Sequence, residues 1–110
     1  MEADFHSFFS LDDLRNDLEE VAQALLQSCR RGVPRRPIAV CQLKERIVFT
    51  LQPSDRPPQD LRFVPLTNPD TPALLAVLQE RWMGGYEPVG LVVDENEDNT
   101  TQAFLLVQKN

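Results

Sequence analysis

The residues best suited to bind a charged ligand are four arginines in the segment RRGVPRRP, residues 30–37. Guanidinium groups hold phosphate and carboxylate oxygens through paired hydrogen bonds. Arg30, Arg31, Arg35 and Arg36 are therefore a candidate contact for an anionic ligand or nucleic acid. A structural explanation competes with this one. Arg30 and Arg31 close a predicted helix, and cations stabilise a helix C-terminus, whereas anions bind at the opposite end.

Other patterns of catalytic or metal-binding residues are absent from the sequence. His6 is the single histidine, and Cys29 and Cys41 do not have the paired spacing of a zinc site. The run DENEDN, residues 94–99, begins like a calcium loop but has no glycine at the sixth position and no glutamate at the twelfth. We expect no metal, no cofactor and no enzymatic activity; a small enzyme with its site between helix and sheet is an alternative.

Two aromatic residues flank the Gly84-Gly85 pair and suggest a pocket. Trp82 and Tyr86 have the size and polarity to line a small ligand site. A tryptophan on the apolar stripe of a helix is more often part of the core, so we expect Trp82 to be buried.

Composition and charge restrict the remaining possibilities. A chain of 110 residues with 42% hydrophobic side chains forms one domain, 1–110, with an N-terminal arm at 1–9. The net charge is −6, and the basic segment 30–46 lies between acidic flanks, so the charge pattern disfavours nucleic acid as a partner. No apolar run reaches the length of a membrane span, and the acidic start does not resemble an export signal. We therefore expect a cytoplasmic protein with reduced cysteines, which we expect to be buried.

Two helices are predicted from capping residues and apolar spacing. The first begins after Ser10, with Asp13 completing a capping box, and ends near Arg31 before Gly32. The second has Thr71 as its N-cap and ends at Gly84. Its predicted buried stripe consists of Leu74, Leu75, Leu78 and Trp82.

Alternating apolar residues predict about five strands. The first two are predicted to form a hairpin at Lys44–Arg46, with one long bent strand as the alternative. A third strand, LRFVPL, contains Pro65, which predicts an edge position or the end of a strand. Two more strands flank the acidic run after the second helix. The order α-β-β-β-α-β-β predicts an α+β two-layer sandwich, with both helices on one face of a mostly antiparallel sheet.

The uncovered face of this predicted sheet is partly apolar and suggests a binding surface. An apolar face usually meets a partner, most simply a second copy of the chain. We expect a non-enzymatic interaction or assembly module that forms a homodimer. The arm is expected to dock on a sheet through its phenylalanines. The candidate interface residues are Phe5, Phe8, Phe9, Ile38, Val48, Phe104 and Leu106.

Residues 61–109, from RFVPL to LLVQK, resemble small bacterial domains of unknown function. In those domains a helix ends in a Gly-aromatic-Glu step, here GGYEPV, and is followed by a hairpin with a short basic tail, here VQKN. The resemblance implies a βαββ fold and implies no functional site.

Overall fold

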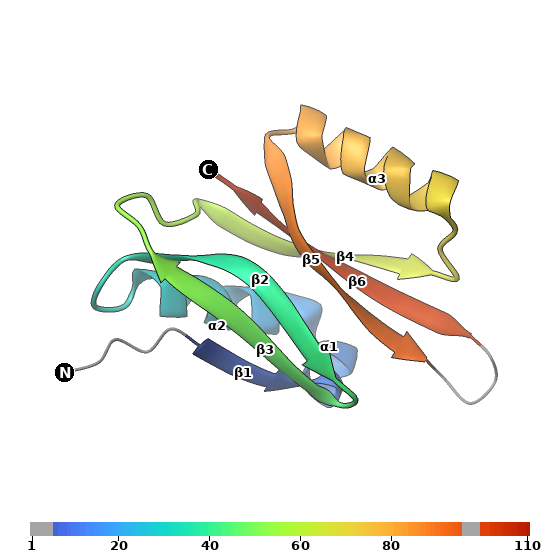
Figure 1. Cartoon of the computed structure of the whole chain (residues 1–110), viewed down its shortest axis with the longest axis horizontal. Coiled ribbons are helices and arrows are strands. Elements are labelled where there is room, and N and C mark those ends of the chain that lie inside the picture. Colours follow the sequence, from blue (N-terminus) through green and yellow to red (C-terminus); the bar gives the residue numbers. More distant parts are fainter. Residues whose placement is uncertain (1–5, 96–99) are drawn as a thin grey trace.

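The computed structural model describes residues 6–95 and 100–110, and for His6 the backbone alone (Figure 1). These residues contain three helices and six strands. The helices are α1 (Leu11–Asn16), α2 (Leu18–Arg30) and α3 (Thr71–Met83); the strands are β1 (His6–Ser10), β2 (Arg35–Leu43), β3 (Arg46–Pro53), β4 (Asp60–Thr67), β5 (Tyr86–Glu95) and β6 (Thr101–Lys109).

The strands form two antiparallel sheets, ordered β1-β3-β2 and β4-β6-β5. Helices α1 and α2 lie behind the first sheet in Figure 1 and pack in one core with residues of both sheets, whereas α3 lies apart from them against the second sheet. The α+β class is confirmed. The predicted element order is correct from β2 onward, but strand β1 precedes the first helix, and that helix is divided into α1 and α2. The prediction of one five-stranded sheet with both helices on the same face is wrong.

The facing edges of the two sheets explain why one continuous sheet does not form. Strand β2 contains Pro37 and strand β5 contains Pro88, and each strand is irregular in register just after its proline. A proline removes a backbone donor and a bulge turns the strand away from its neighbour. The edges nevertheless approach closely, because a Cβ added at Gly90 would lie 2.9 Å from a methyl carbon of Val40.

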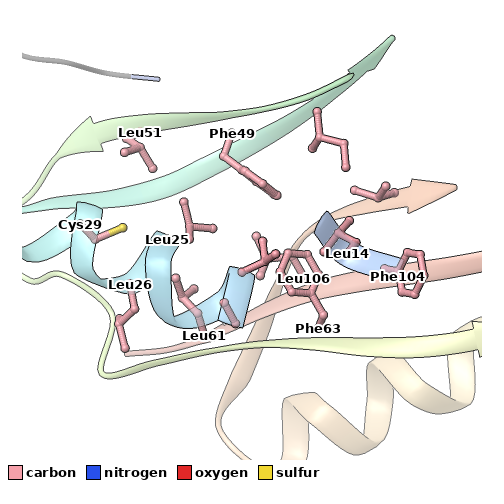
Figure 2. Packing of buried hydrophobic residues seen from close by; sticks show 14 of the residues in the cluster. Leu14, Leu25, Leu26, Cys29, Phe49, Leu51, Leu61, Phe63, Phe104 and Leu106 are labelled. Carbon is pink, nitrogen blue, oxygen red and sulfur yellow. The ribbon is translucent and has the colours of Figure 1, made fainter. Parts of the chain in front are cut away.

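The core lies where the inner faces of both sheets meet α1 and α2 (Figure 2). It is built on fully buried side chains such as Leu25 of α2, Phe49 of β3 and Leu106 of β6. At about 25 cal/mol per Å² of apolar area, such burial is the main favourable term in folding. Cys29 belongs to this core, as expected, whereas Cys41 is exposed, and both are free thiols.

Local signals at the helix termini are largely borne out. The capping box forms, since the Ser10 amide donates to Asp13 at 2.9 Å and the Asp13 amide donates to the Ser10 hydroxyl at 3.3 Å. The predicted first helix is interrupted at Asp17, an extended residue that ends α1 and also caps α2 by accepting from the Glu20 amide. The break lets α1 and α2 cover different parts of the core.

Within the described residues the N-terminal arm docks on the first sheet, but not through both phenylalanines as predicted, because Phe8 is 73% exposed. Residues 6–10 form β1, which pairs with β3, and Phe9 packs edge-on against Phe49 with ring centroids 5.7 Å apart. Phe5 lies outside the described residues.

Strand β6 is buried on both faces, as its apolar sequence predicts. Phe104 and Leu106 face the core, and by alternation Ala103, Leu105 and Val107 face the side of α3.

Candidate functional site

The strongest candidate site is the outward side of α3. Asp70 caps this helix by accepting from the Ala73 amide at 2.9 Å, one residue before the predicted cap. Leu74, Val77, Leu78 and Arg81, spaced by three or four residues, are half-buried against the second sheet. No residue of the helix is fully buried. The helix therefore contributes one face to this molecule and leaves the other open.

The open side is apolar, although it faces solvent. We call it the α3 outer face; it consists of Pro72, Leu75, Ala76, Gln79, Trp82 and Met83, all exposed. Leu75 is 59%, Trp82 67% and Met83 80% exposed. On a helical wheel these six residues span roughly a third of the circumference and include no charged side chain. The prediction that Leu75 and Trp82 are buried is wrong. The helix is apolar on two sides, and the sheet covers the side opposite these two residues.

Tyr86 is held by polar and cationic neighbours at the start of β5. Its hydroxyl donates to the Asp60 carboxylate at 2.5 Å, and that carboxylate also accepts from Arg62 at 2.7 Å. The charged groups of Arg62 and Lys109 each lie 5.8 Å from the centre of the tyrosine ring. The bond to Asp60, with partial burial, raises the pKa of Tyr86. Tyr86 thus connects both edge strands of the second sheet, whereas Trp82 is turned to solvent.

The four arginines of the predicted anion site do not converge. Arg35 is buried, and its guanidinium donates to the carbonyls of Ser28 at 3.1 Å and Arg31 at 3.3 Å, which closes the C-terminus of α2. Arg36 follows it in the strand and points the other way, to Glu87 at 2.9 Å and to the Asn110 side chain.

The other two arginines of the cluster, Arg30 and Arg31, are exposed at the end of α2. Arg30 donates to the carbonyl of Gln59 at 3.3 Å. The structural explanation of the cluster, a stabilised helix C-terminus, accounts for Arg35 best.

The predicted interface residues are divided between core and surface. Phe104 and Leu106, 5% and 0% exposed, belong to the core and are not on an open face. The reason is that the inner face of the second sheet packs against α1 and α2. Phe8 and Ile38 are exposed and Val48 is half-buried, all on the first sheet.

An ion-pair network centred on Arg15 has no signal in the sequence. Arg15 binds both carboxylate oxygens of the buried Asp94, each at 2.7 Å, and also contacts Asp12 at 2.7 Å and Glu45 at 3.2 Å. The hydrogen bonds from Arg15 lower the pKa of Asp94. This network ties α1, the β2–β3 turn and β5 together. Arg15 and Asp94 are far apart in the chain, so only the fold brings them together.

Within the described ranges, 6–95 and 100–110, no group of histidine, cysteine or acidic side chains is arranged to hold a metal ion. The helices in that part of the chain are too short and too polar to cross a bilayer. Residues 96–99 of the acidic run lie outside the described ranges.

Comparisons with family models, with curated proteins and with solved structures gave no match to this chain.

Proposed function

We propose that the protein is a non-enzymatic interaction module that self-associates through the α3 outer face. The observation that carries the proposal is a helix that is apolar on both sides but covered on only one. A helix that is apolar all round is normally buried all round. Exposed apolar patches on otherwise soluble domains usually mark binding surfaces.

The pattern of side-chain sizes on this face favours a second copy as the partner. Gln79 lies at the centre of the face, and its amide can both donate and accept, so it can pair with its own symmetry mate. If two α3 helices pack antiparallel about a two-fold axis at Gln79, Ala76 of one copy faces Trp82 of the other. In the same arrangement Leu75 faces Met83. The small Ala76 then meets the large Trp82, two flexible apolar side chains meet at Leu75 and Met83, and no charged side chain of the face enters the contact.

The expected affinity is modest. A helix of 13 residues is about 20 Å long, and a standard interface buries about 800 Å² on each partner. Because α3 alone supplies less than this area, we expect a dimer with a dissociation constant in the micromolar range. The anionic-ligand alternative has less support, because Arg35 and Arg36 already have partners within the chain.

Sedimentation equilibrium of wild type and two variants tests the proposal. Ala76→Glu and Trp82→Glu each place a charge in the contact, and we expect either to weaken the dimer by about 30-fold or more, the loss of a hot spot of about 2 kcal/mol. Gln27→Glu makes a matched charge change on the exposed side of α2 and should leave the dimer intact. A wild type that stays monomeric at high micromolar concentration would contradict the proposal.

The symmetry is tested by crosslinking. In a Cys41→Ser background, Gln79→Cys should form an intermolecular disulfide under mild oxidation, since the residue meets its own copy on the axis. Gln52→Cys, on the exposed end of β3, is the control and should remain largely unlinked.

A further inference from the structure

Strand β4 has a free edge along a groove. It is the terminal strand of the second sheet, so β6 pairs with only one of its sides. The Asn68 amide donates to the Thr101 carbonyl at 2.7 Å, in the same register as the β4–β6 pairing. Antiparallel strands alternate their hydrogen-bonding side, which puts the backbone groups of Leu61, Phe63, Pro65 and Thr67 on the free edge. Pro65 has no N–H, but its backbone groups point away from β6, so no hydrogen bond between β4 and β6 is lost.

A groove of about 290 Å³ runs beside the first half of this edge. Residues 60–64 of β4 form one wall, and Leu18, Glu19, Ala22 and Gln23 of α2 form the other. Arg81 of α3 closes the groove from the other side of the sheet. The groove thus lies beside backbone groups that can pair with an added strand. It also has space for the side chains of that strand.

Arg81 indicates that the groove lacks a hydrogen-bond acceptor. Its Nε is buried without a hydrogen-bond partner, and among the ion pairs of the described residues none involves Arg81. The nearby Arg62 and Asp60 already bind each other. A buried donor without an acceptor destabilises the folded state. A carboxylate brought into the groove would give Arg81 the acceptor it is missing.

We propose that the β4 edge binds an extended, acidic segment of a partner protein, which adds as a fourth strand and places a carboxylate on Arg81. Backbone hydrogen bonds to Phe63 and Thr67 would supply affinity, and the carboxylate would supply specificity. The proposal rests on the function proposed above only in treating the protein as an interaction module. The groove and the α3 outer face are made of different residues.

A display library of random peptides about ten residues long, the upper range of strand lengths, provides the probe. We expect enriched peptides to contain an acidic residue and to slow hydrogen exchange at the Phe63 amide. For the best peptide, changing its acidic residue to the corresponding amide should weaken binding about tenfold in wild type and leave it unchanged in Arg81→Gln. Arg31→Gln is the matched control on an exposed arginine and should bind both peptides as wild type does.

Three results would overturn the proposal. These are a library that yields no binder, binders that leave Phe63 exchange unchanged, and an Arg81→Gln variant that still prefers the acidic peptide. The same measurement on Trp82→Glu separates the two proposals. If this variant binds peptide as wild type does, the groove acts independently of dimer formation. If wild type binds peptide but remains a monomer, self-association fails and the groove stands.

Discussion

The side-chain amide of Gln42 on β2 hydrogen-bonds the backbone of Val93 on β5 in both directions. Its Nε2 donates to the Val93 carbonyl at 2.5 Å, and its Oε1 accepts from the Val93 amide at 2.9 Å. A side chain here makes the bonds that a neighbouring strand would otherwise make. The two sheets are thereby connected where their backbones do not pair.

Replacing Gln42 tests this connection. Gln42→Ala removes both bonds and leaves two backbone groups of Val93 without protein partners, so we expect the free energy of unfolding to fall by about 1–3 kcal/mol. Gln42→Glu should be at least as destabilising, because a carboxylate faces the Val93 carbonyl. Urea denaturation measures both variants. Gln52→Ala, an exposed strand glutamine, is the control and should change stability by less than about 0.5 kcal/mol.

Gly90 is predicted to be required by the close approach of β2. An alanine Cβ at this position would lie 2.9 Å and 3.0 Å from two side-chain carbons of Val40. We expect Gly90→Ala to lower thermal stability by about 1–3 kcal/mol, the usual cost of overpacking. The double variant with Val40→Ala should regain part of that loss. Gly84→Ala, whose nearest contact would be 3.5 Å, is the control; equal effects at Gly84 and Gly90 would argue against this explanation.

The ion pair between Arg15 and Asp94 predicts a pH dependence. Because the folded pKa of Asp94 is lowered, the pair contributes stability above the unfolded value of about 3.9, and this contribution is lost as pH falls through the folded pKa. Asp94→Asn should therefore be less stable than wild type at neutral pH, and the difference should shrink in acid below about pH 4. Thermal melts across that range measure it. Asp55→Asn, on an exposed loop, is the control, and its melting temperature should change with pH as that of wild type does.

The two cysteines should differ sharply in reactivity. Burial raises the pKa of Cys29 to about 11, whereas Cys41 is exposed. The lower thiolate fraction alone slows the reaction of Cys29 with a thiol reagent by about two to three orders of magnitude relative to an ordinary thiol. Ellman's reagent should label one thiol per native chain quickly and the second only after unfolding. Rapid labelling of native Cys41→Ser would show that Cys29 is accessible.

Local structure was predictable wherever neighbouring residues determine it. Short-range patterns predict the capping box at Ser10, the hairpin at residues 44–46, the edge position of Pro65 and the burial of β6 on both faces. The break at Asp17 was missed because apolar spacing continues across it. The same residue type that interrupts the helix is also a good cap for the next one.

The arrangement of these elements was not predictable, since it depends on contacts between distant residues. Helix α3 carries apolar residues on two sides, so periodicity alone does not identify the covered one. The single expected sheet divides at the prolines of β2 and β5. The partners of Arg35, Arg36 and Arg15 are likewise set by the tertiary fold, which is why the arginine cluster suggested a ligand site.

The central position of β6 has a consequence for synthesis on the ribosome. Strands β4 and β5 pair with β6 and not with each other, whereas the first sheet is complete once β3 has been made. During translation, β4 and β5 therefore lack their strand partner until β6 emerges. Their unpaired backbone edges make such an incomplete chain prone to aggregate.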